Sequence, residues 1–288
     1  MRNSSRTGIF LMLLASLGFS CSDIGVKVLG ENLSVWQMVS GRGLLGVAVV
    51  LIIIRFQLSR LLVSQWRTQL ILGFASAFGF TFFILSIKYL PLSISMPLSY
   101  FYPALAAIMS PLINNEKPSR EDWLAITLGL GGVICFSQSS SGNEGQSLLT
   151  GIVFGLIGAL FIALMVSLAR RQTRSVPLSV NLFYLYFANA VTCLPLLILF
   201  DAPLIPAKAD LAKLFLFIAP ISIISFGLMF VAFRYISAHR GGTILMLEAG
   251  VAALYGLLIL NEPLNIFIIL GGLLMLVSAI IITRASSG

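Results

Sequence analysis

Two charged residues lie within long apolar stretches of this 288-residue sequence. Arg42 lies in a stretch from 34 to 54, and Glu248 lies in a stretch from 241 to 260. Charged side chains are costly in a hydrocarbon layer, so they mark binding sites there or form ion pairs. An arginine stays protonated and needs a carboxylate, which either Glu248 or a bound solute would provide. We therefore predict Arg42 and Glu248 as binding residues, with a structural ion pair between two helices as the alternative.

Three further residues extend this candidate site. Asp23 lies four residues before Lys27 on one face of the first apolar stretch, so it either joins the site or pairs with Lys27 at the surface. Tyr100 and Tyr102 lie in a proline-rich stretch, and prolines free backbone carbonyls that only neighbouring helices or a water-filled cavity can satisfy. The two tyrosines therefore either line a cavity or pack in the core.

No catalytic or metal-binding arrangement is visible in the sequence. Serine, histidine and aspartate occur without the context of a catalytic triad, and no glycine-rich loop with lysine would cradle a phosphate. The single histidine, His239, is predicted to lie in a loop between two apolar stretches. The three cysteines, Cys21, Cys135 and Cys193, show neither disulfide nor metal spacing. We therefore expect no catalytic residue, no metal and no cofactor, and we predict that the protein is not an enzyme.

The composition places these residues in a membrane protein. The sequence is 58% hydrophobic and 10% charged, whereas soluble domains carry about 25% charged residues. Its net charge is +8, but the basic residues are scattered, so no nucleic-acid partner is expected. Ten apolar stretches are long enough to cross a hydrocarbon layer of about 30 Å. They lie near residues 7–28, 34–54, 68–88, 91–113, 121–138, 148–168, 178–200, 211–233, 241–260 and 264–283.

The basic residues also predict how the chain is oriented. With the N-terminus in the cytoplasm, thirteen lysines and arginines fall on the cytoplasmic side, and Arg42 lies within a span. Only four fall on the outer side, namely Lys27, Lys88, Lys208 and Lys213. Because cytoplasmic loops carry the excess of positive charge, both termini are predicted to be cytoplasmic, with the protein integral to a bacterial inner (plasma) membrane.

A segment of the first half recurs in the second half at an offset of 146 residues. The stretch 88–116 returns as 234–262, each beginning with a basic residue and tyrosine and ending in Asn-Glu. Because each copy has five spans, an odd number, the second copy enters the membrane in the opposite orientation. We therefore predict an all-α polytopic membrane protein of ten transmembrane helices in two inverted five-helix repeats, residues 1–138 and 148–288, with an outer linker at 139–147.

Inverted repeats are typical of secondary transporters, in which two similar halves expose a central site alternately. The repeat aligns Tyr102 with Glu248, so we expect these side chains to face each other across the pseudo-twofold axis. This predicts a small-molecule substrate bound near the membrane midplane. The alternative classes are an intramembrane enzyme, a lipid-handling protein and a structural membrane protein that transports no solute.

These features resemble the drug/metabolite transporter superfamily, in particular its EamA-type members. The resemblance rests on the repeats, on Arg42 early in the second span, on the Asn-Glu endings and on glycine-rich fifth and tenth spans. Within the superfamily, residues 19–23 with Lys27, and residues 247–248, are similar to a subgroup proposed to move S-adenosylmethionine and related metabolites. The resemblance implies an exporter or exchanger of a small polar or amphipathic metabolite, such as an amino acid or a compound like S-adenosylmethionine.

Protons are a further candidate partner. If Arg42 leaves Glu248 to hold the substrate in one state, Glu248 can bind a proton in that state, which would make a proton exchanger. If the two stay together, transport is facilitated diffusion or solute exchange and ignores a proton gradient. We expect the second behaviour, because the sequence offers only one midplane carboxylate and the ten-helix relatives that it resembles include such carriers.

Overall fold

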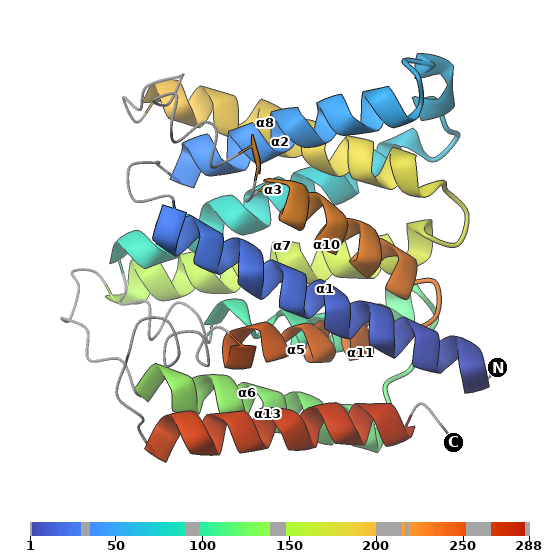
Figure 1. Ribbon diagram of the computed structural model, residues 1–288. Coiled ribbons are helices and arrows are strands. Elements are labelled where there is room, and N and C mark those ends of the chain that lie inside the picture. The colour runs from blue at the N-terminus through green and yellow to red at the C-terminus, as the bar shows by residue number, and fades with distance from the viewer. Residues whose placement is uncertain are drawn as a thin grey trace.

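The computed structural model describes residues 2–29, 35–89, 98–138, 148–199, 215–216, 219–251 and 266–285. The regular elements in these ranges are helices, as predicted, and most of them run along one common direction (Figure 1). Their bounds are α1 Arg2–Leu29, α2 Val35–Ile53, η1 Leu58–Leu61, α3 Trp66–Tyr89, α5 Tyr102–Ile113, α6 Arg120–Gln138, α7 Leu148–Gln172, α8 Leu178–Leu199, α10 Ala219–Ala232, α11 Ala238–Leu245 and α13 Ile266–Ala285.

Several helices are long and apolar enough to cross a membrane. Within the described residues, four reach this length, namely Ser5–Ser22, Trp66–Ser86, Leu149–Gln172 and Leu178–Leu197. Shorter apolar helices accompany them at Val39–Ile53, Tyr102–Ile113, Ala219–Ala232 and Ile269–Ile282. Many large apolar side chains point outward, and this surface suits hydrocarbon rather than water. The count of ten spans and their inverted arrangement stay predictions.

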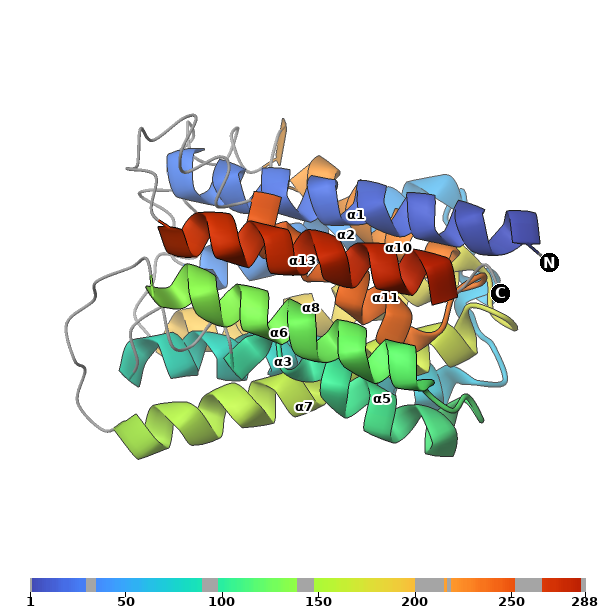
Figure 2. The same ribbon diagram turned by 90° about the horizontal axis from the view of Figure 1, so that it is seen from below.

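The two halves of the chain are interleaved rather than separate. The most extensive contacts pair α3 with α7, α6 with α13, α2 with α8, and α1 with α10. In Figure 1 the α6–α13 pair lies at one edge of the bundle and α2 and α8 lie at the opposite edge, and in Figure 2, seen from below, α6 and α13 lie nearest to the viewer (Figures 1 and 2). Any site in the middle of the bundle is therefore built from both halves.

Helices α2 and α8 approach closely at two glycines. A Cβ atom on Gly43 would lie 2.7 Å from the backbone nitrogen of Ala190, and one on Gly46 would lie 2.3 Å from Cγ of Tyr186. No other residue fits at either position without displacing α8, and small residues of this kind let membrane helices pack closely. The close approach brings Arg42, the neighbour of Gly43, up to the side of α8 that carries Tyr186.

Both chain termini lie at the same end of the bundle, which we call the terminal end (Figure 1). The described connections between helices also lie there, at residues 54–65, 114–119, 173–177 and 233–237. The sequence predicts this end to be cytoplasmic, because it carries most of the arginines.

Candidate functional site

A small cavity lies among α2, α3, α8 and α10, at the predicted position of Arg42. The Arg42 guanidinium lies over the ring of Phe80, with Cζ 5.7 Å from the ring centroid, a cation–π contact. The lining combines this cation with polar and aromatic side chains, and it is called the Arg42 cavity below. Its residues are Val39, Arg42, Gly43, Phe80, Leu185, Tyr186, Asn189, Ser222 and Phe226.

Two buried hydroxyl groups in the Arg42 cavity are poorly satisfied. Tyr186 Oη and Ser222 Oγ lie close together, yet neither makes a hydrogen bond of normal geometry within the described part of the chain. Asn189 is held in place, because its Nδ2 donates to the Leu185 carbonyl at 2.7 Å and to Ser76 Oγ at 3.3 Å. Buried polar groups in proteins usually have partners, so these two hydroxyls offer hydrogen bonds to a ligand or a water.

The Arg42 cavity is too small for a metabolite in this conformation. Its volume is about 10 Å³, roughly the room that one water molecule needs. Pockets for metabolite-sized ligands hold at least about 300 Å³. The Arg42 cavity could therefore hold a metabolite only if the surrounding helices moved apart.

The other predicted residues lie on the side of α1, α5 and α11. Tyr102 begins α5, is buried, and donates through Oη to the Gly242 carbonyl of α11 at 3.1 Å. Glu248 lies just beyond α11, and its backbone carbonyl accepts a hydrogen bond of 3.1 Å from Ser20 Oγ of α1. The Glu248 carboxylate lies within electrostatic range of Tyr102, its partner in the predicted repeat. Tyr100 and Leu247 both pack against the buried cluster that includes Met246.

An aromatic pair separates these two groups of residues. Phe226 lines the Arg42 cavity and packs edge-on against Phe19 of α1, with 4.8 Å between ring centroids. The next residue after Phe19 is Ser20, which bonds to the backbone of Glu248. The structure records no ion pair between Arg42 and Glu248, both of which it describes. Asp23 follows in α1, but its side chain lies outside the described part of the structure.

An ion-pair network at the terminal end was not predicted from the sequence. Arg170 of α7 donates through Nε and Nη2 to Glu116 Oε1, at 3.0 and 2.8 Å, and through Nη1 to the Phe233 carbonyl after α10. Arg174 donates to the same Glu116 oxygen at 3.1 Å. The Arg170 side chain is only 7% exposed. One buried guanidinium therefore ties α7 to the segment after α5 and to the end of α10.

A second buried cluster at the terminal end centres on Asp122, in the first turn of α6. Its carboxylate accepts hydrogen bonds from the backbone of Ser119 at 2.8 Å and from Arg240 Nε at 2.7 Å. His239 Nε2 lies 3.2 Å from the same carboxylate, and the His239 and Asp122 side chains are 2% and 1% exposed. The cluster fixes the start of α6 against the start of α11.

The prediction that His239 lies in a loop is wrong. Helix α11 begins at Ala238, so His239 lies in its first turn and is buried. The sequence pattern placed the start of this span after the polar pair His239 and Arg240, because it did not reveal their partner Asp122 on α6. Ser237 Oγ and Asp122 both contact the same ring nitrogen, Nε2, whereas a catalytic triad uses the two ring nitrogens separately. The geometry is that of a packing cluster.

Comparison with known proteins gives matches along both halves of the chain. The profile of the EamA-like transporter family matches residues 6–138 and 149–284. The pseudopaline exporter CntI of Pseudomonas aeruginosa is 24% identical over 289 residues, which cover 98% of each chain.

Two further similarities were found. An uncharacterized transporter of Helicobacter pylori strain J99 is 28% identical over 167 residues, which is 57% of this chain and 55% of that protein. The chain thus matches only about half of the length of this relative. One solved crystal structure has the same fold, with a TM-score of 0.83 at 18% identity, covering 99% of this chain and 98% of the other.

Proposed function

Because the chain belongs to the EamA-like transporter family, we propose that this membrane transporter moves a small polar or amphipathic metabolite by alternating access. The observation that carries the proposal is the Arg42 cavity, which is built from both halves of the chain. In this cavity the Arg42 guanidinium lies beside two aromatic rings and two hydroxyl groups, of Tyr186 and Ser222, that lack a hydrogen bond of normal geometry. A solute with a carboxylate and an apolar or flat part fits this lining.

The substrate class follows from the chemistry of this lining. The guanidinium pairs with an anionic group, the hydroxyls of Tyr186 and Ser222 bond to polar atoms, and Phe80 and Phe226 pack against the remainder. Amino acids and compounds like S-adenosylmethionine have this combination of groups. The relative in Pseudomonas aeruginosa is named as an exporter, which supports outward movement.

The helix contacts support two inverted repeats. Under the offset between the halves, α3 corresponds to α10, α7 to α1, and α8 to α2. The contact of α3 with α7 then corresponds to that of α10 with α1. The contact of α3 with α8 corresponds to that of α10 with α2 in the same way. Halves related like this can exchange conformations and so open opposite ends.

Transport is tested in two steps. Comparing metabolites inside and outside cells with and without the protein identifies candidate solutes. Counterflow of each candidate in proteoliposomes then tests for saturable exchange, which we expect for at least one of them. A structural or lipid-handling protein would give no saturable counterflow with any candidate.

The predicted topology gives a direct expectation. A reporter fused after Gly288 is expected on the cytoplasmic side, and one inserted in the linker at 139–147 is expected outside. The physical reason is the excess of arginines at the terminal end. A matched pair of reporters, one active only in the cytoplasm and one active only outside, measures both positions. A cytoplasmic signal from the linker would contradict the inverted repeat.

Coupling gives a second expectation. We expect transport by facilitated diffusion or exchange, so a pH gradient across proteoliposomes should not drive accumulation of the solute. The same should hold for Glu248→Gln, which removes the one carboxylate predicted at the midplane. Accumulation that follows the gradient in the parent protein and is lost in Glu248→Gln would instead show proton exchange through Glu248.

A further inference from the structure

A polar pocket opens at the terminal end, between the end of α5 and the end of α7. Its volume is about 260 Å³. Its lining residues are Leu112, Ile113, Asn114, Asn115, Arg171 and Arg174. An adjoining pocket of about 470 Å³ shares Arg174 and includes Arg234. Neither pocket belongs to the Arg42 cavity, and the transport mechanism makes no use of them.

The two pockets carry more positive charge than the nearby carboxylate balances. Glu116 is bonded through Oε1 to Arg170 and Arg174, and Arg170 is buried. Arg174 is 55% exposed, and Arg171 is also exposed. Among the residues that the structure describes, no carboxylate forms an ion pair with Arg171. The arginines at the end of α7 also stabilise its dipole, but that role needs neither the pocket nor Arg234.

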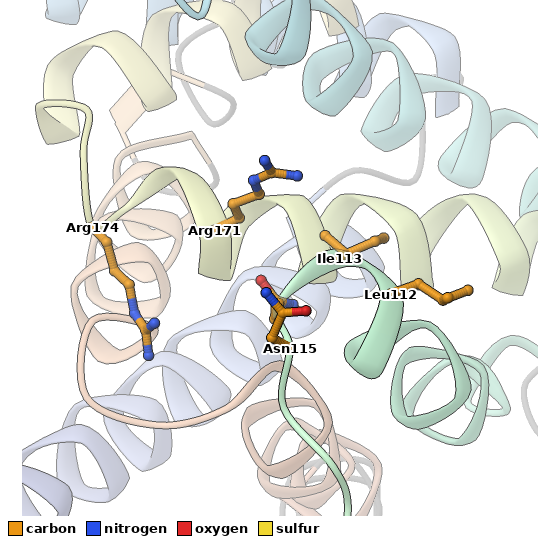
Figure 3. A pocket seen from close by; sticks show the side chains of 6 residues that line it. Leu112, Ile113, Asn115, Arg171 and Arg174 are labelled. Atoms are coloured by element: carbon orange, nitrogen blue, oxygen red, sulfur yellow. The ribbon is translucent and has the colours of Figure 1, made fainter.

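The pocket continues into an apolar surface along α5. Leu112 lines the pocket and is 85% exposed, and Ile108, one helical turn earlier, is 59% exposed. In Figure 3, Arg174 lies at one side of the pocket and Leu112 at the other, with Asn115 between them. The Arg171 and Arg174 side chains extend to opposite sides of the end of α7. The hydrogen-bond donors of the pocket are therefore spread around its opening. The exposed apolar strip of Leu112 and Ile108 begins at one side of that opening.

We propose that this pocket binds the headgroup of an anionic phospholipid, with an acyl chain lying along Leu112 and Ile108. A phosphate ester accepts hydrogen bonds from Arg174 and the Asn115 amide, Arg171 attracts it through its charge, and the phosphate offsets the surplus of arginines. Basic pockets at the cytoplasmic ends of membrane helices bind acidic lipid headgroups in this way. Free phosphate would gain less, because the donors are spread apart and the apolar strip would stay uncovered. The proposal holds whatever solute the protein carries.

Lipid retention tests the proposal on the full-length protein. Purified, delipidated protein is mixed with phosphatidylglycerol or phosphatidylcholine, and bound lipid is counted by native mass spectrometry alongside the thermal unfolding midpoint. We expect preferential retention of phosphatidylglycerol and a rise in the midpoint with that lipid. Each arginine near the surface contributes enough attraction to change binding about fivefold. Arg171→Gln should therefore reduce the preference about fivefold, and Arg171→Gln with Arg174→Gln should reduce it further.

Matched variants separate this site from general surface charge. Arg55→Gln with Arg60→Gln removes two exposed arginines from the same end of the bundle, outside the pocket, and should leave the preference unchanged. Arg171→Lys keeps the charge and should retain most of it. Arg171 has no ion pair to lose, so the single variant stays informative if the double variant unfolds. Equal retention of the two lipids, or equal loss in the control, would overturn the proposal, as would inorganic phosphate raising the midpoint as much as phosphatidylglycerol does.

Discussion

Replacement of Arg42 by alanine is expected to abolish counterflow of the solute identified for the parent protein. Among the described residues that line the Arg42 cavity, Arg42 supplies the only guanidinium, and hydrogen bonds to a charged group contribute about 1.5 to 3 kcal/mol. Their loss weakens binding about 10- to 150-fold. Arg42→Lys keeps the charge but loses the planar donor geometry, so it should retain partial activity. The measurement is counterflow at several solute concentrations, with the protein level determined in the same vesicles.

Two controls separate binding from folding. Arg60→Ala removes an exposed arginine of η1 and should transport normally. The double variant Arg42→Ala with Glu248→Ala tests the alternative that the two residues only balance each other's charge. In that case the double change should restore much of the protein level and activity that the single change removes. Full activity of Arg42→Ala would exclude Arg42 from the site.

Neutralising Glu116 is expected to favour opening of the terminal end. Glu116→Gln leaves the Arg170 guanidinium buried without a carboxylate, and breaking a buried ion pair costs about 3 kcal/mol or more. Under the proposed alternating access, the cost falls on the conformation described here, because Arg170 is buried in it and opening of this end would hydrate the guanidinium. An energy of this size shifts the equilibrium between the two conformations about 100-fold.

Accessibility of the Arg42 cavity measures this shift. In a background without Cys21, Cys135 and Cys193, Ser222→Cys places a single thiol in the cavity lining. A membrane-impermeant thiol reagent added from the terminal side should react with it at least about tenfold faster when Glu116→Gln is also present.

The exposed carboxylate Glu121 provides a matched control at the same end. Glu121→Gln makes the same chemical change outside the network and should leave the reaction rate unchanged. Adding Arg170→Gln to Glu116→Gln removes the stranded charge and should return the rate toward that of the parent. Equal rates in the parent and in Glu116→Gln would show that the ion pair does not hold this end closed.

The helices were predictable because an apolar stretch long enough to cross a membrane has few alternatives to forming a helix there. The predicted span 34–54 is described as Val35–Ile53, and the predicted span 121–138 as Arg120–Gln138. The span predicted at 241–260 was less accurate at its start, since α11 begins at Ala238. Burial of His239 and the position of Arg240 there depend on Asp122, more than one hundred residues earlier in the chain. Hydropathy along the chain carries no information about such a partner.

The sequence indicated individual residues of the candidate site, but it did not indicate which of them lie close together. The cost of a charge within an apolar span indicated Arg42 and Glu248 individually, but it gave no distance between them. The structure places Arg42 against Phe80 and Glu248 near Tyr102, with Phe19 and Phe226 between the two groups. Aromatic side chains are abundant in this sequence, so nothing in it distinguished Phe226 from its neighbours. The roles of these residues in binding stay predictions until the Arg42 variants are measured.

The cluster around Asp122 joins the two halves of the chain, and its charged residues do not recur at the positions that the repeat relates to them. Under the offset of 146 residues, Asp122 corresponds to Ile268, His239 to Ser93, and Arg240 to Ile94, none of which carries a charge. If the halves exchange conformations, the residues at these related positions carry no charge with which to form the same cluster at the opposite end. Hydrogen bonds to charged groups contribute about 1.5 to 3 kcal/mol, so the resting ensemble should be skewed at least about tenfold toward molecules whose terminal end is sealed. Most empty carriers would then expose the site to the opposite compartment. Solute from the terminal side could bind only to the less populated conformation, in which the terminal end is open.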